Sequence, residues 1–213
     1  MEFVLDAMEI RVLGSLIEKE LSTPEYYPLS LNALTNACNQ KSNRDPVVAY
    51  DEASVASVAD RLAEKGLVWK SGVGRVPKYE ERFTHERSLV PRESAVICVL
   101  LLRGPQTVGE IRGRTARLHD FESLEEVQET LGNLVEWGYA QKLPRMPGHK
   151  ESRYRDLLRG DDEAPVEPEV FELPDISKIE IVRIEKIEEA VERMQKEIED
   201  LKTAFSTFKK QFD

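Results

Sequence analysis

The sequence predicts an α+β chain that is mainly α-helical, with two copies of one small unit followed by a C-terminal coiled-coil helix. Three observations predict this organisation. Each copy shows three amphipathic helical patterns followed by two short strand patterns. Matched glycines, Gly66 and Gly138, end the third helical pattern of each copy. Near the C-terminus, apolar residues recur at alternating spacings of three and four, which is typical of a coiled coil.

The first copy spans residues 1–86. Helix starts are indicated by polar N-cap residues, and a turn that contains two glycines separates the two strands. The expected elements are helices over residues 5–20, after Ser30 and after Asp51, then strands over residues 67–70 and 76–83. The side chains expected in the core are apolar and share one face of each helix: Ile10, Leu13, Leu16, Ile17, Leu31, Leu34, Cys38, Val55, Val58 and Leu62.

The second copy spans residues 91–159 and repeats this order. Two capping boxes, in which a hydroxyl and a glutamate three residues later bond each other's backbone N–H, start at Thr107 and Ser123. The expected elements are helices from Pro91, after Thr107 and after Ser123, then strands over residues 139–143 and 152–158. The side chains expected to point inward are Val108, Ile111, Leu118, Val127, Leu131, Leu134 and Val135.

Three helices followed by a β-hairpin make a winged helix, so the sequence predicts two tandem winged-helix domains. Residues 160–175 are acidic and contain prolines, and we expect a linker there. Residues 176–213 are expected to form the coiled-coil helix, which makes a homodimer the expected assembly; folding of this helix back onto the chain's own domains is the alternative. The seam that would form the dimer consists of Ile184, Ile187, Val191, Met194, Ile198, Leu201, Phe205 and Phe208, with Phe212 continuing it.

The net charge of −10 lies mostly at the C-terminal end, where residues 161–213 hold 8 basic and 16 acidic residues. The rest of the chain is near neutral, which permits a local basic patch. The longest apolar run, residues 95–102, is too short to cross a bilayer, and residues 1–6 carry two carboxylates where a signal segment would be basic. The two cysteines are far apart in sequence, so we expect a cytoplasmic protein with reduced thiols and no membrane association.

Several longer motifs point to one family. They are Glu18-Lys19 with residues 23–30 (TPEYYPLS), residues 38–47 (CNQKSNRDPV), and residues 100–107 (LLLRGPQT) with the arginines that follow. Together they resemble the YceH family, a group of bacterial proteins of uncharacterised function. The resemblance covers residues 1 to about 160 and implies two winged-helix domains. It implies no activity, ligand or catalytic residue.

The leading functional hypothesis is a DNA-associated regulator. The third helix of the second copy begins with four carboxylates, Glu122, Glu125, Glu126 and Glu129, which is not typical of a helix that reads the major groove. Positive charge lies instead on the second helix of that copy and on the two hairpins, where it could contact phosphate or form surface ion pairs. The expected nucleic-acid-binding residues are Asn39, Gln40, Lys41, Asn43, Arg44, Arg75, Lys78, Arg112, Arg114, Arg117, Lys150 and Arg153.

The amides among these residues have two possible roles. Asn and Gln side chains can pair with base edges, but amides that follow a helix can also bond its unpaired carbonyls and shape the next loop. His85, His119 and His149 lack metal-ligand spacing, and no nucleophile or phosphate-loop motif is present. We therefore expect a non-enzymatic protein without metal or cofactor. The alternative function is a protein–protein adaptor, in which the acidic third helices and the coil dock a partner.

Overall fold

The computed structural model describes residues 4–72, 76–146, 148 and 151–159. The chain divides into two compact units, Met1–Asp162 and Glu163–Asp213, and the described residues all belong to the first. The predicted linker and dimerisation seam therefore lie outside the described residues. Of the helices in the described ranges, none has the length and apolar character needed to cross a membrane.

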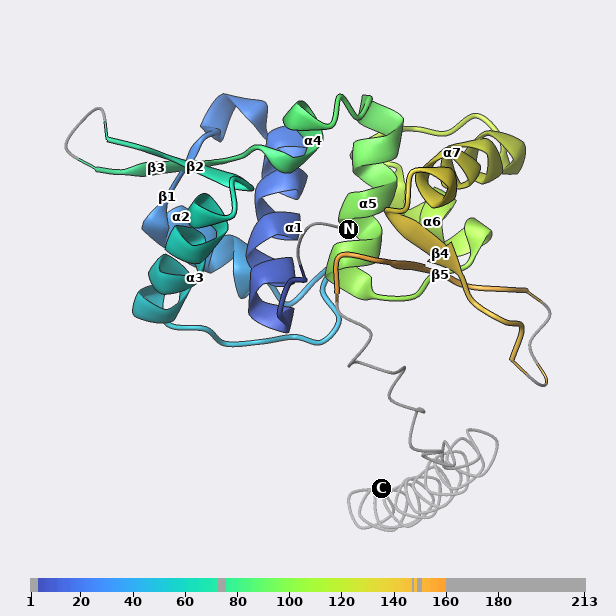
Figure 1. Ribbon diagram of the computed structural model, residues 1–213, viewed down its shortest axis with the longest axis horizontal. Helices are drawn as coiled ribbons and strands as arrows, with labels where there is room; N and C mark the ends of the chain where they lie inside the picture. Colours follow the sequence, from blue (N-terminus) through green and yellow to red (C-terminus); the bar gives the residue numbers. More distant parts are fainter. Residues whose placement is uncertain (1–3, 73–75, 147, 149–150, 160–213) are drawn as a thin grey trace, which may run out of the picture. The chain divides into compact units, whose positions relative to one another are not determined.

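The first half of this unit contains helices and a small antiparallel sheet (Figure 1). Asp6 caps the first helix by accepting hydrogen bonds from the N–H groups of Met8 and Glu9. The three strands lie in the order β1 (Leu29–Ser30), β3 (Lys78–Glu81) and β2 (Val68–Ser71), with Leu29 opposite Tyr79. The elements are α1 (Ala7–Ser22), η1 (Pro24–Tyr26), β1 (Leu29–Ser30), α2 (Leu31–Cys38), α3 (Glu52–Glu64), β2 (Val68–Ser71), β3 (Lys78–Glu81) and α4 (Phe83–Glu86).

The second half repeats the order of the first. Its elements are α5 (Pro91–Arg103), α6 (Val108–Thr115), α7 (Leu124–Glu136), β4 (Ala140–Lys142) and β5 (Tyr154–Asp156). The backbone of Gln106, just before α6, exchanges two hydrogen bonds with Tyr154 of β5, at 2.9 and 2.7 Å. This pairing corresponds to that of Leu29 with Tyr79, so in both halves the segment before the second helix adds to the returning strand of the hairpin.

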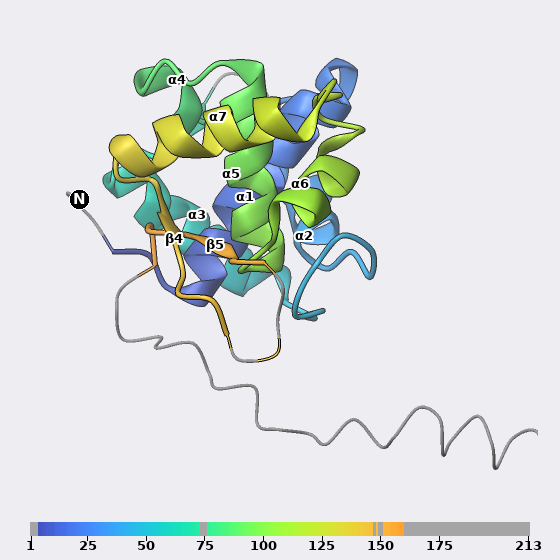
Figure 2. The ribbon, with the colours of Figure 1, turned by 90° about the vertical axis from the view of Figure 1, so that its right-hand side faces the viewer.

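Helices α1 and α5 lie side by side and join the two halves (Figures 1 and 2). Gly14 permits this approach, because a Cβ atom there would lie 2.9 Å from Cδ2 of Leu102 and 3.1 Å from Cβ of Leu101. Residues of both halves form one hydrophobic core, with Leu13 and Leu16 of α1 and Leu100 of α5 fully buried. The cavities along this junction are therefore bounded by side chains from both copies of the repeat.

The prediction of a mainly helical α+β chain is confirmed, and Gly66 and Gly138 end α3 and α7 with φ of 72° and 77°. The returning strand of the first hairpin is shorter than predicted, because the chain turns into α4 at Phe83. At Ser123 only half of the capping box forms: its hydroxyl accepts from Glu126 N–H, but the Glu126 carboxylate accepts from Glu122 N–H.

The prediction that Val135 points inward is wrong, since Val135 is 39% exposed. The buried face of α7 consists of Val127, Thr130, Leu131 and Leu134. At 3.6 residues per turn, Val135 lies roughly 90° around the helix from the centre of that face. Its side chain therefore points to the surface near the C-terminal end of the helix.

Candidate functional site: a cationic pocket between the two halves

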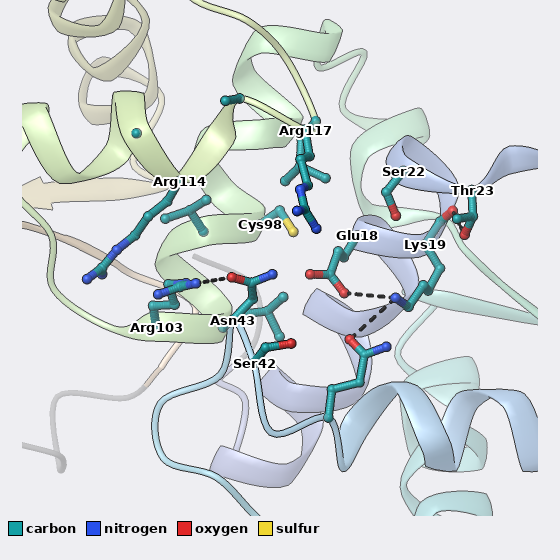
Figure 3. Close-up of a pocket in the computed structure, with 16 residues that line it drawn as sticks. Glu18, Lys19, Ser22, Thr23, Ser42, Asn43, Cys98, Arg103, Arg114 and Arg117 are labelled. Carbon is teal, nitrogen blue, oxygen red and sulfur yellow. Dashed lines mark hydrogen bonds and ion pairs between the residues drawn. The ribbon is translucent and has the colours of Figure 1, made fainter.

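A pocket of about 970 Å³ opens between α1, the loop after α2, α5 and α6 (Figure 3). We call it the cationic pocket, because four of its lining residues are basic and one is acidic. The lining consists of Glu18, Lys19, Ser22, Thr23, Gln40, Ser42, Asn43, Cys98, Val99, Leu102, Arg103, Gly113, Arg114, Ala116, Arg117 and Leu118. The pocket thus draws on both copies of the repeat.

One wall is set by an ion pair between Arg44 and Glu18. Two guanidinium nitrogens of Arg44 donate to the two Glu18 oxygens at 3.0 and 2.6 Å, and the Arg44 side chain is fully buried. Arg44 also donates to the carbonyl of Ala37 at 2.9 and 3.2 Å, near the end of α2. These bonds fix the loop after α2 against α1, so Arg44 positions the wall.

Two further contacts hold the same loop. The side chain of Asn39 accepts from Tyr50 N–H and donates to the Tyr50 carbonyl, both at 2.7 Å, which closes the base of the loop. The N–H of Asp45 donates to the carbonyl of Leu102 at the end of α5, at 2.9 Å. The loop is therefore tied to the second half of the unit, and residues 40–43 are held at the pocket edge.

The opposite wall carries Arg103 from α5, Arg114 from α6 and Arg117 just beyond α6 (Figure 3). Arg103 donates a hydrogen bond to the side-chain oxygen of Asn43. Arg114 lies 4.0 Å from Glu110, but that carboxylate forms closer bonds to Arg153, at 3.0 and 3.3 Å. Arg117 extends toward the pocket without a hydrogen bond or ion pair to any described residue.

The charges in the pocket do not cancel. Burial opposes ionisation of Glu18, but the hydrogen bond and charge of Arg44 outweigh it and lower the pKa of Glu18. Glu18 is therefore an anion whose charge is neutralised by Arg44, and Lys19 lies farther from it, at 3.5 Å. Burial, followed by the positive charges of Arg114 and Arg44, lowers the pKa of Arg103. The pocket is thus a concave surface with surplus positive charge, which suits an anion.

The residues predicted to bind nucleic acid separate into groups. Gln40, Asn43, Arg114 and Arg117 line the cationic pocket, and Lys41 is exposed between two lining residues. Asn39, Arg44, Arg153 and Arg112 are not part of that lining and are hydrogen-bonded within the protein; Arg112 donates to the carbonyls of Phe121 and Glu122. Lys78 is exposed on β3, whereas Arg75 and Lys150 lie outside the described residues.

Four residues of the pocket were not predicted as site residues: Lys19, Ser22, Thr23 and Arg103. Lys19 and Ser22 lie in the last turn of α1, and Thr23 is the residue that caps it. Arg103 is the last residue of α5. Nothing in their spacing along the chain relates the two helix ends. The motifs of the YceH resemblance contain Lys19, Thr23 and Arg103, but only the packing of α1 on α5 shows that these residues line one pocket.

A second cluster lies near α4, where Glu20, Glu81 and His85 each offer a ligand atom within 4.8 Å of the others. Nε2 of His85 is 2.7 Å from Glu20 and 3.6 Å from the buried carboxylate of Glu81. These are ligand types that a divalent cation accepts, and the same geometry suits a protonated histidine between two carboxylates. Glu81 and His85 are four residues apart, but Glu20 lies 65 positions before His85, so the sequence spacing did not bring the three residues together.

Comparison with known proteins places the chain among uncharacterised bacterial sequences. A family described as "Protein of unknown function, DUF480" matches residues 5–149. A "UPF0502 protein" of Solibacter usitatus is 50% identical over 216 residues, covering 100% of both chains. Another, from Aeromonas hydrophila, is 44% identical over 206 residues, which is 93% of this chain and 95% of that protein. The expected resemblance to an uncharacterised bacterial family is confirmed at that level.

Proposed function

Because the chain belongs to the DUF480 family, whose function is unknown, we propose a function from its own geometry: a non-enzymatic, DNA-associated regulator. In this proposal the cationic pocket and its rim hold phosphates of the DNA backbone. The single observation that carries it is the convergence of Lys19, Arg103, Arg114 and Arg117 on one concave surface. Arginine and lysine are the residues that meet backbone phosphates in protein–DNA complexes.

We further propose that each half is a winged helix, in keeping with the YceH resemblance. The support is topological: in both halves a helix, a short segment paired with the hairpin (strand β1 in the first half, the single residue Gln106 in the second), two helices and the hairpin itself follow one another. That order is typical of the winged helix, although fold alone does not set function. The C-terminal heptad repeat would pair two chains and so present two cationic pockets to one duplex.

The third helices have the wrong charge for groove reading, which favours contact elsewhere. Exposed carboxylates on α7 include Glu125 and Glu129. The cations at the C-terminal end of α3 are already paired, Arg61 with Asp6 at 2.7 Å and the cap residue Lys65 with Glu9 at 2.7 Å. Phosphate contact through the rim of the cationic pocket avoids both helices. The exposed side chains of Lys41 and Lys78 would add further contacts to backbone phosphates.

The test is an electrophoretic mobility shift of the full chain with random-sequence duplex at increasing salt. Binding through phosphates predicts a steep loss of affinity between about 50 and 200 mM salt. Arg117→Glu should weaken binding at least tenfold, because it reverses a charge in the pocket. Lys142→Glu is the matched control, since Lys142 lies on β4 away from the pocket and over the Tyr154 ring. Absence of a shifted band at about 50 mM salt would refute the proposal.

A protein–protein adaptor is the second candidate, and α7 is the observation that favours it. Leu124, Val135 and Trp137, at the two ends of this helix, are 43%, 39% and 49% exposed; Glu125 follows Leu124, and the exposed Glu136 lies between Val135 and Trp137. Exposed apolar groups rimmed by charge are typical of protein-binding surfaces. This candidate predicts that Leu124→Ser with Trp137→Ser abolishes binding of an isolated partner, whereas Arg117→Glu leaves it unchanged. The reverse pattern would favour phosphate binding.

A further inference from the structure

The interior of the cationic pocket is larger than a contact with one backbone phosphate requires. Its volume of about 970 Å³ lies at the upper end of the range of small-molecule sites, which is roughly 300–1,000 Å³. A backbone phosphate held by arginines at the rim would leave the deeper part of this volume unused. The interior therefore has room for a separate ligand of small-molecule size.

The lining of the pocket combines apolar side chains with side chains that form hydrogen bonds, and each kind suits a different part of such a ligand. The apolar floor consists of Val99 and Leu102, which are 4% and 2% exposed, and of Leu118, which is half-buried and offers more of its surface. Hydroxyl and amide side chains surround it, contributed by Ser22, Thr23, Ser42, Gln40 and Asn43. These groups can exchange hydrogen bonds with sugar hydroxyls and with the edges of a base. The floor can cover a planar apolar surface.

The basic side chains of the pocket suit an anionic group of the ligand. Arg103 and Arg117 belong to the second half of the unit and Lys19 to the first, and all three line the same hollow. Burial, followed by the positive charges of Arg114 and Arg44, lowers the pKa of Arg103, so the cationic side chains around this hollow repel one another. An anionic group between them would relieve the repulsion and form charge-assisted hydrogen bonds.

We propose that the interior of the cationic pocket binds a nucleoside phosphate, with the phosphate between Lys19, Arg103 and Arg117. The sugar and base then lie over the apolar floor and bond the amides and hydroxyls at the end of α1 and in the loop after α2. Occupation of the pocket engages Arg117, which the proposed function assigns to DNA. The expectation that nucleotide and DNA compete for Arg117 therefore rests on the proposed function. The expectation that the pocket binds a nucleotide does not.

The test is isothermal titration of the full chain with AMP, GMP, CMP and UMP, each alone. At least one should bind with Kd below about 100 µM, and at least tenfold more tightly than its nucleoside and than inorganic phosphate. Equal binding of inorganic phosphate would overturn the role of the floor and amides. Equal binding of the nucleoside would overturn the role of the cations, and no binding of any nucleotide below about 1 mM would overturn the proposal entirely.

Arg117→Gln is the diagnostic variant, because Arg117 is exposed and makes no hydrogen bond or ion pair to a described residue, so its loss does not disturb the fold. It should weaken nucleotide binding at least tenfold, and Lys142→Gln should leave it unchanged. Equal affinity of the Arg117→Gln and parent chains would contradict the assigned phosphate position. Arg103→Gln is a second variant, with its melting temperature measured alongside.

Failure of this inference and failure of the proposed function are distinguishable, because each binding is measured without the other ligand. Nucleotide binding without any DNA shift would refute the proposed function alone. DNA binding without nucleotide binding would refute this inference alone. Where both occur, saturating nucleotide should release the duplex, and unchanged DNA affinity would overturn the shared use of Arg117.

Discussion

Arg44 and Glu18 form a two-bond ion pair, at 3.0 and 2.6 Å, that joins the loop after α2 to α1 and borders the cationic pocket. The Arg44 side chain is fully buried and that of Glu18 is 10% exposed. This pair removes the one carboxylate of the pocket lining from the charge balance. It is therefore both a structural clamp and the reason that the pocket is positive.

Glu18→Gln should lower the free energy of unfolding by about 3 kcal/mol, because it leaves a buried guanidinium without its counter-ion. Urea unfolding followed by circular dichroism measures the change. Glu18→Gln combined with Arg44→Met removes both charges and should recover part of the loss. A decrease below about 1 kcal/mol in the single variant would show that the carbonyl bonds of Arg44 hold the loop without Glu18.

Gly14→Ala should lower the free energy of unfolding by about 2 kcal/mol, since its Cβ would lie 2.9 Å from Leu102 and force α1 away from α5. Gly132→Ala is the matched control, because a Cβ at Gly132 meets nothing within 4 Å. That change sits inside α7 and should stabilise the chain by about 0.5–1 kcal/mol through helix propensity. Equal effects of the two substitutions, measured by urea unfolding, would contradict the close approach of α1 and α5.

Structural features with a local cause could be predicted from the sequence, and features that depend on contacts between distant residues could not. The start of α6 was predictable, because the bonds of Thr107 and Glu110 involve neighbouring backbone groups. The end of α3 was predictable from Gly66, whose positive φ other residues rarely adopt. Both signals are read within a few residues.

The cationic pocket was only half predictable. Charge counting pointed to the arginines of α6, but it could not separate Arg112, which bonds backbone carbonyls, from Arg114, which lines the pocket. Lys19 and Arg103 meet there because α1 packs on α5, and hydrophobic periodicity does not say which helix packs on which. Of the amides after α2, Asn39 is bonded to Tyr50, whereas Gln40 and Asn43 line the pocket and accept hydrogen bonds from Arg44 and Arg103.

The stability of the chain should fall as pH rises above about 6.5, through His85. Burial lowers the pKa of His85, but the hydrogen bond to Glu20 and the charges of Glu20 and Glu81 outweigh it, so the net shift is upward. A raised pKa means that the folded state holds the proton more tightly. The stabilisation is therefore complete below the ordinary value of about 6.5 and is lost as pH rises through the folded value.

Urea midpoints between pH 5.5 and 8.5 measure this effect as the difference between the parent chain and His85→Asn. Burial also raises the pKa of Glu81, so the folded chain loses stability as pH rises through the titration of Glu81, which begins at a lower pH than that of His85. Subtracting the His85→Asn curve from the parent curve removes this contribution and leaves that of the histidine. His119→Asn is the control for loss of a histidine elsewhere. Parallel curves for the parent and His85→Asn would contradict the ion pair with Glu20.

Both thiols should be unreactive in the folded chain. Burial raises the pKa of Cys38 to about 11, and it raises the pKa of Cys98 as well. At pH 8 a thiol with that pKa is only about 0.1% thiolate, and both side chains are at most 1% exposed. Titration with a thiol reagent should give no fast phase under native conditions and two reactive groups in urea. A fast native phase would show that the pocket opens at Cys98.

Removal of residues 161–213 should convert a dimer to a monomer, because the predicted a/d stripe needs a second helix to cover it. Sedimentation equilibrium of the full chain and of a chain ending at Gly160 measures the change. Ile198→Asp in the full chain should have the same effect, since it places a charge at a predicted a position. A truncated chain that stays dimeric would move the interface to residues 1–160. A monomeric full chain would mean that the stripe is covered by the chain's own domains, and DNA binding through paired pockets would then lose its geometric basis.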